Sequence, residues 1–153
     1  MFERLLSAIR HGDPDACLAA GLLLERARGR DVARLLAQEG LEVWSPLVLG
    51  PEDRLALLST LQEDLLKPAF PTEVIWALKA DASSEALRPL LGYLRRRLAG
   101  PERDPREYLA LNAILSIDWP EAEEAVKLAL NVESEELREE AQAWLESRGE
   151  SHR

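Results

Sequence analysis

The chain of 153 residues is predicted to be all-α, and three observations carry the prediction. Hydrophobic residues make up 46% of it and are mostly Leu and Ala, which favour helices. Residue types that favour strands are scarce, with four Ile, six Val, two Phe and two Tyr. Apolar positions recur at intervals of three and four residues, as in Leu55, Leu58, Leu61 and Leu65, and no segment alternates with period two for long.

Helix boundaries are marked by Gly or Pro followed by residue types that begin helices. Gly12-Asp13-Pro14 and Gly100-Pro101 are two such breaks. One domain is expected over 1–149, because a chain of this length suits a single core, and a disordered tail is expected at 150–153. Segment 41–50 is predicted to be a short or irregular helix. The breaks predict about nine helices, at 2–10, 14–27, 31–39, 51–66, 72–80, 84–98, 105–116, 120–130 and 134–147.

Two stretches of the chain are nearly the same. DPDACLAAGLLLERARGRDVARLL at 13–36 and DPREYLALNAILSIDWPEAEEAVKLAL at 104–130 align from their Asp-Pro starts, with Leu18 on Leu109. Repeat units then begin near residues 13, 42, 72, 104 and 135, with a period of about thirty. A repeat of this length made of two helices is typical of an α-solenoid, in which stacked pairs bury a continuous core.

The repeated pattern resembles HEAT-like repeats, especially the short bacterial kind first described in phycobilisome lyases. The resemblance rests on the Asp-Pro starts, on a first helix rich in small residues, and on second helices such as SEALRPLLGYL at 84–94, where Pro89 lies at that family's frequent proline position. It covers roughly residues 13–148, and the unit at 41–66 departs most from it. It implies a short right-handed α-solenoid of antiparallel helix pairs, with helices 2–10 and 134–147 as end caps.

Net charge and cysteine content limit the partners and the compartment. The formal charge is −9, which makes nucleic acid and anionic membranes unlikely partners for the chain as a whole. The one cysteine, Cys17, cannot form an internal disulfide and suits a reducing cytosol. The start of the chain lacks the apolar core of a secretory signal, so a cytoplasmic location is expected. The scarcity of Asn, Gln, Met and Cys suits a thermophilic source.

Few residues suit metal binding or nucleophilic catalysis. His11 and His152 have no partner at ligand spacing, so no metal and no cofactor are expected. His11 is interpreted as a helix C-terminal residue and Cys17 as a buried structural thiol. Acidic residues gather in predicted first turns of helices, where they complement the helix dipole and are expected to be solvated. These residues are Glu121, Glu123, Glu124, Glu133, Glu135 and Glu136.

The basic cluster YLRRRL at 93–98 departs from the acidic background. Arg88 and Arg95 lie seven residues apart and therefore share one flank of their helix. By the resemblance they lie near the concave surface of a helix pair, where they would hold a phosphate or a carboxylate. The favoured alternative is that they pair with the surplus Glu of the chain. The core stripe of the same helix is expected to consist of Leu87, Leu91, Leu94 and Leu98.

Tryptophan is frequent for a chain with few other aromatic residues. Trp76 and Trp144 occupy apolar stripes and are expected in the core, as is Leu115 between the last two full units. Trp119, between Asp118 and Pro120 at a helix start, is a further candidate binding residue.

Two classes of function fit these observations. The favoured one is a non-enzymatic scaffold whose groove binds a protein or peptide, with Arg88, Arg95 and Trp119 as candidate binding residues. The alternative is a nucleic-acid-related binder or a DNA-alkylation-type glycosylase, because such glycosylases are also built from HEAT-like repeats. Their strongly basic groove has no clear counterpart in this sequence. A chromophore-lyase or chaperone-like role is implied by the phycobilisome branch alone.

Overall fold

The computed structural model describes residues 2–25, 50–116 and 120–151. Within these ranges every regular element is an α-helix and none is a strand, which confirms the all-α prediction. The chain divides into two compact units, Met1–Asp81 and Ala82–Arg153. The predicted helix 31–39, most of segment 41–50 and the candidate residue Trp119 lie outside the described residues.

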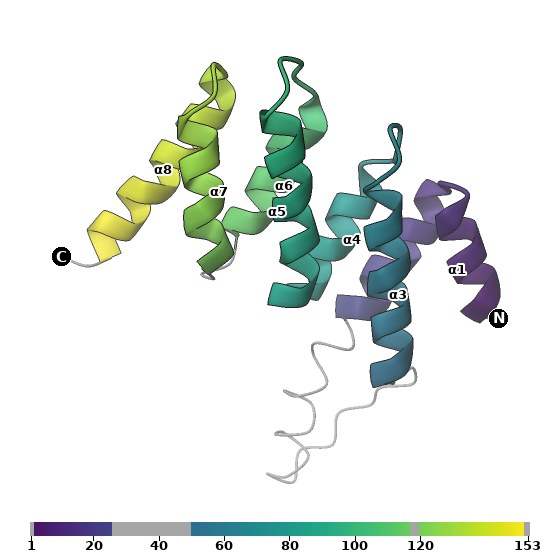
Figure 1. Cartoon of the computed structure of the whole chain (residues 1–153). Coiled ribbons are helices and arrows are strands. Elements are labelled where there is room, and N and C mark those ends of the chain that lie inside the picture. The colour runs from purple at the N-terminus through teal and green to yellow at the C-terminus, as the bar shows by residue number, and fades with distance from the viewer. Residues whose placement is uncertain (1, 26–49, 117–119, 152–153) are drawn as a thin grey trace, which may run out of the picture. The chain divides into compact units, whose positions relative to one another are not determined.

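The first unit is built from α1, helical residues 14–25, α3 and α4. Helix α1 packs against α3, and α3 packs against α4 (Figure 1). The core includes Cys17 and Leu24 from the helix at 14–25, both fully buried. The predicted starts at 14 and 51 are confirmed, and each follows a local start signal. The labelled helices run over Phe2–Arg10 (α1), Pro51–Asp64 (α3) and Glu73–Asp81 (α4).

Local chemistry explains where α1 and α3 end and begin. After α1, Gly12 has a φ of 78°, a left-handed conformation that stops a helix and favours glycine. His11 donates from Nδ1 to the carbonyl oxygen of Ser7 at 2.7 Å, which confirms its interpretation as a helix C-terminal residue. Pro51 opens α3 at a position where no backbone N–H is needed.

The second unit contains α5, α6, α7 and α8. Each helix packs against the next one along the chain, and α5 also packs against α7, as α6 does against α8 (Figure 1). The predicted packing of helix 105–116 against helix 120–130 is therefore confirmed. Helix α8 runs past its predicted end at 147 into the expected tail 150–153. The four helices run over Ser84–Leu98 (α5), Pro105–Leu115 (α6), Pro120–Leu130 (α7) and Glu135–Ser151 (α8).

Asp13 and Asp104, which the repeat aligns, cap their helices in the same way. Oδ1 of Asp13 accepts the backbone N–H of Asp15 at 3.0 Å, and Oδ1 of Asp104 accepts that of Arg106 at 2.8 Å. The aligned Leu18 and Leu109 are both exposed. The two similar stretches therefore share a helix start and the orientation of their first leucine.

Three residues predicted in the core are not fully buried. Trp76 is 41% exposed. One part of its indole ring lies against the backbone of Gly21, where a Cβ would come within 2.4 Å of the ring. Leu115 is half-buried because it is the last residue of α6, whereas its neighbour Ile114 is fully buried. Trp144 of α8 is also half-buried.

The core stripe of α5 matches its prediction closely. Leu87, Leu91 and Leu94 are buried, while Leu98, at the last turn, is half-buried. Leu90 and Tyr93, which lie outside that stripe, are buried as well. The α5 surface available to solvent is therefore narrower than the sequence predicted.

Candidate binding surfaces

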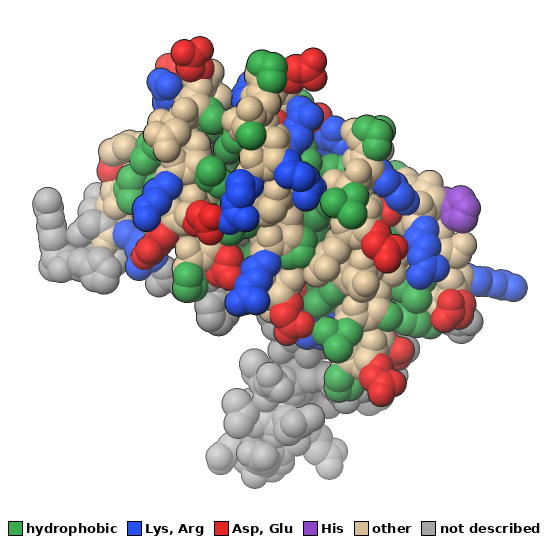
Figure 2. Space-filling model, in the orientation of Figure 1, with side chains coloured by type: hydrophobic (Ala, Val, Ile, Leu, Met, Phe, Trp, Pro, Cys, Tyr) green, Lys and Arg blue, Asp and Glu red, His purple; other side chains and the backbone are tan. Residues whose placement is uncertain are grey.

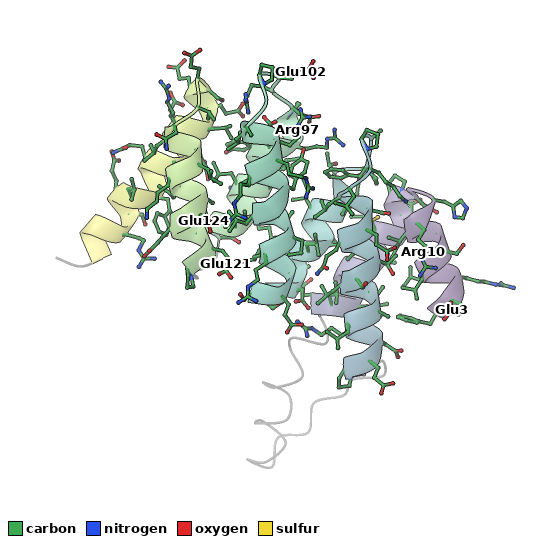
Figure 3. All side chains as sticks on the ribbon, viewed as in Figure 1. Glu3, Arg10, Arg97, Glu102, Glu121 and Glu124 are labelled. Carbon is green, nitrogen blue, oxygen red and sulfur yellow. The ribbon has the colours of Figure 1, made fainter. Side chains whose placement is uncertain are left out.

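Arg88 and Arg95 lie on the side of α5 that faces α7, and each pairs with a glutamate there. Nε of Arg88 donates to Oε1 of Glu121 at 3.2 Å, and Nη2 of Arg95 donates to Oε1 of Glu124. Figure 3 shows both glutamates on the α5 side of α7, and Figure 2 shows Lys and Arg side chains gathered over α5. Arg88 and Arg95 therefore pair with glutamates of the chain, as the favoured alternative predicted. These four residues are called the α5–α7 face.

The two arginines of this face remain largely in solvent. Their side chains are 74% exposed for Arg88 and 55% exposed for Arg95. Ion pairs between exposed side chains contribute about 0–1 kcal/mol to stability, because water screens them and ordering two long side chains costs entropy. Both arginines are thus available to exchange an internal carboxylate for one on another molecule.

Glu121 departs from its predicted place on a solvated first turn, because it is buried. The N-terminal turn of α5 covers it: Oγ of Ser84 donates to its Oε1 at 2.6 Å. That hydrogen bond, followed by the one from Arg88, lowers the pKa of Glu121. Glu121 therefore holds the start of α7 against the start of α5, and it anchors one end of the α5–α7 face.

A second ion-pair cluster at the turn between α5 and α6 is largely buried. Its centre is Glu107, which is 1% exposed. Oε2 of Glu107 accepts Nε of Arg97 at 3.1 Å, and Oε1 accepts Nη1 of Arg103 at 3.4 Å. The same Oε1 accepts the backbone N–H of Asp104 at 3.1 Å, which completes a capping box. We call Arg97, Arg103, Asp104, Arg106 and Glu107 the turn cluster.

Within the turn cluster, Asp104 binds Arg106 with Nη2 to Oδ2 at 2.6 Å. This hydrogen bond from Arg106 lowers the pKa of Asp104 to about 2. Every carboxylate of the turn cluster is therefore engaged within the unit, and the cluster fixes the connection between two helices. The sequence analysis missed Glu107, although its position three residues after Asp104 matches the capping-box spacing.

A groove between α7 and α8 contains a cavity of about 320 Å³. Its apolar wall includes Leu130 and Leu145, both exposed, and the half-buried Trp144. The guanidinium carbon of Arg148 lies 4.8 Å from the centre of the Trp144 ring, within the range of a cation–π contact. We call this cavity the α7–α8 groove. It is lined by Glu123, Val126, Lys127, Leu130, Trp144, Leu145 and Arg148.

A smaller cavity of about 220 Å³ lies at the N-terminal ends of α6 and α8. Two of the polar side chains that line it are bonded inside the unit. Arg103 donates to Glu107, and the Tyr108 hydroxyl donates to Oε2 of Glu140 at 3.1 Å. The bond to Glu140 also raises the pKa of Tyr108. The residues that line this cavity therefore connect α6 with α8.

In the first unit, Cys17 matches its prediction as a structural thiol. It is fully buried, and burial raises its pKa to about 12, with Asp64 adding to the rise. A protonated, inaccessible thiol is a poor nucleophile at neutral pH. Asp81, also buried, accepts two hydrogen bonds from Arg54, at 2.9 and 2.8 Å, which is a structural contact between α3 and α4.

Neither metal ligation nor membrane insertion is visible in the described part of the chain. Its His, Cys, Asp and Glu residues form no group of three that would hold a metal ion. None of its helices is long and apolar enough to cross a membrane.

The chain was compared with protein families, curated proteins and solved structures. No protein-family model, no curated protein and no solved structure matches this chain.

Proposed function

We propose that this protein is a helical-repeat scaffold without enzymatic activity that binds a polypeptide partner through the α5–α7 face. The packing of the second unit supports a HEAT-like stack of helices, because neighbouring helices contact each other and α5 and α6 also contact the next helix but one. The shared Asp-Pro caps of the helix at 14–25 and of α6 support the same repeat. The single reduced Cys17 supports a cytoplasmic location.

The exposure of Arg88 and Arg95 is the observation that carries this proposal. Both arginines lie on one side of α5, and most of each side chain is in solvent. Arginine binds carboxylates in a planar, two-pronged geometry, which suits recognition of acidic side chains on a partner. The internal pairs with Glu121 and Glu124 hold the arginines in position at little cost to stability.

A polypeptide partner fits this face better than a nucleic acid does. Glu121 and Glu124 offset the charge of the two arginines, and the whole chain carries −9. Binding to DNA depends on neutralising several phosphates, which needs a continuous basic surface. The turn cluster does not extend that surface, because its arginines bind Glu107 and Asp104.

The test is affinity capture from an extract of the source organism with two immobilised variants. Arg88→Gln together with Arg95→Gln removes both charges and keeps the side-chain stems, whereas charge reversal would place Glu beside Glu121 and Glu124. Arg96→Gln, an exposed arginine one position from Arg95, is the matched control. We expect quantitative mass spectrometry to show a protein that binds the wild type and the control but is lost from the double variant.

Nuclease treatment and a DNA-binding assay separate the two classes of function. Loss of the captured protein after nuclease treatment, or a mobility shift with an alkylated DNA duplex that Arg88→Gln abolishes, would favour the nucleic-acid alternative. Equal capture by the wild type and the double variant would remove the α5–α7 face from the binding surface.

A further inference from the structure

We propose that the α7–α8 groove is a second docking site, which binds a polypeptide segment with bulky apolar side chains next to an acidic residue. This site shares no residue with the α5–α7 face. The inference rests on the proposed function in one respect, that the chain binds polypeptides. Its geometry comes from the last two helices alone.

The apolar wall of the groove supplies the first half of the argument. The cavity of about 320 Å³ lies at the lower end of the roughly 300–1,000 Å³ typical of ligand pockets. Leu145 is 39% exposed, and Leu130 beside it in the groove is exposed to a similar extent. Two antiparallel helices with apolar residues along their seam form the kind of groove that accepts side chains of an amphipathic helix.

The charges at the groove supply the second half. Its lining carries two cations, Lys127 and Arg148, and one anion, Glu123, so the groove has a charge of +1 in a chain of −9. Among the described residues, no ion pair within 4.0 Å involves Lys127, although acidic side chains are in excess. Arg148 is held by the Trp144 ring. An acidic side chain entering the groove would complement Lys127.

A foreign polypeptide suits the groove better than two other occupants. A second copy of the chain would bring another net charge of −9 against the first, which opposes association. A lipid chain needs an enclosed cavity, whereas Leu130 and Leu145 stay exposed along this one. A peptide can instead bury its anchors in the groove and keep its backbone in water.

The experiment uses a phage-displayed library of random 12-residue peptides selected against the full chain. We expect enriched peptides to combine at least two of Leu, Ile, Phe and Trp with Asp or Glu. Two variants then test the site: Leu145→Glu disrupts the apolar wall, and Lys127→Glu reverses one cation. Each is expected to weaken binding of a synthetic enriched peptide by about tenfold or more in fluorescence polarisation.

Matched controls separate the groove from the rest of the surface. Leu109→Glu alters a leucine on α6 that is 40% exposed and lies outside the groove, and Arg96→Glu changes a charge on α5. Both are expected to bind the peptide as the wild type does. Circular dichroism checks that every variant folds. If Leu145→Glu does not fold, Lys127→Glu alone still tests the site.

Four outcomes would overturn the proposal. They are no enrichment, enriched peptides with basic residues in place of acidic ones, equal peptide binding by Lys127→Glu, and a wild-type dimer in sedimentation that Leu145→Glu dissociates. In the first case, partner capture that depends on Arg88 and Arg95 would leave the proposed function standing while the groove proposal fails. Loss of both would reject both.

Discussion

Helix α5 carries two kinds of Arg–Glu pair, and their difference is one of burial. Arg95 points into solvent and meets Glu124 of α7, which is exposed as well, whereas Arg97 reaches inward to a glutamate that is 1% exposed. An exposed pair contributes about 0–1 kcal/mol. A buried carboxylate that loses its partners leaves charge uncompensated at a cost of about 3–5 kcal/mol. Arg–Glu pairs therefore stabilise the fold at the C-terminal end of α5. Along its side, the same residue types remain available for binding.

The largest expected effect comes from the centre of the turn cluster. Glu107→Ala removes the acceptor for Arg97 and Arg103 together with half of the capping box, and it should lower the free energy of unfolding by about 3–5 kcal/mol, because hydrogen bonds to charged groups contribute about 1.5–3 kcal/mol each and a cap about 1 kcal/mol. Glu124→Ala, in the exposed pair with Arg95, should change it by less than about 1 kcal/mol. Urea denaturation measures both. Equal effects of the two substitutions would contradict the distinction between the pairs.

The same contrast in burial applies to two apolar neighbours on α6. Ile114 is fully buried, so Ile114→Ala should cost about 2–4 kcal/mol from lost burial and the cavity left behind. Leu115 is half-buried at the helix end, so Leu115→Ala should cost only about 1 kcal/mol. Thermal melts of the two variants provide the check. A larger shift for Leu115→Ala would restore the sequence-based assignment of Leu115 to the core.

The pair of Asp104 and Arg106 in the turn cluster should stabilise the fold in a pH-dependent way. The pKa of Asp104 is lowered to about 2, so its carboxylate contributes stability above the unfolded-state pKa of about 3.9, and this contribution is lost as pH falls through about 2. Asp104→Asn keeps the helix cap and should cost about 1 kcal/mol at pH 7. The difference from the wild type should shrink as pH falls below 4. Arg106→Gln breaks the same pair and should show the same trend, and a difference that stays constant to pH 2 would argue against the pair.

The smallest expected effect belongs to the α5–α7 face. Arg95→Ala should alter the free energy of unfolding by about 0.5 kcal/mol or less, because its pair with Glu124 lies in solvent. Urea denaturation at low salt would detect a change of that size. A loss of several kcal/mol would make Arg95 a structural residue and remove the main support for a binding role of this face.

Local sequence signals predicted most helix positions correctly. The Gly-Pro and Asp-Pro starts act within one helical turn, so α3 and α6 begin where these signals lie. The α5 stripe of Leu87, Leu91 and Leu94 followed from its spacing for the same reason. The candidate site was predictable in part: Arg88 and Arg95 share one side of α5, but the glutamates that meet them lie on another helix.

The sequence by itself determined the all-α class and the main helix starts. Each of these depends on composition or on contacts between residues close along the chain. Only the tertiary structure decided that Glu107 and Glu121 are buried, because their burial depends on turns and helices that pack over them. It also decided that Trp76 is exposed: its indole ring lies close to the backbone of Gly21, and 41% of the residue stays accessible to solvent. Burial of a given side chain is set by what lies across from it, and a one-dimensional pattern does not contain that neighbour.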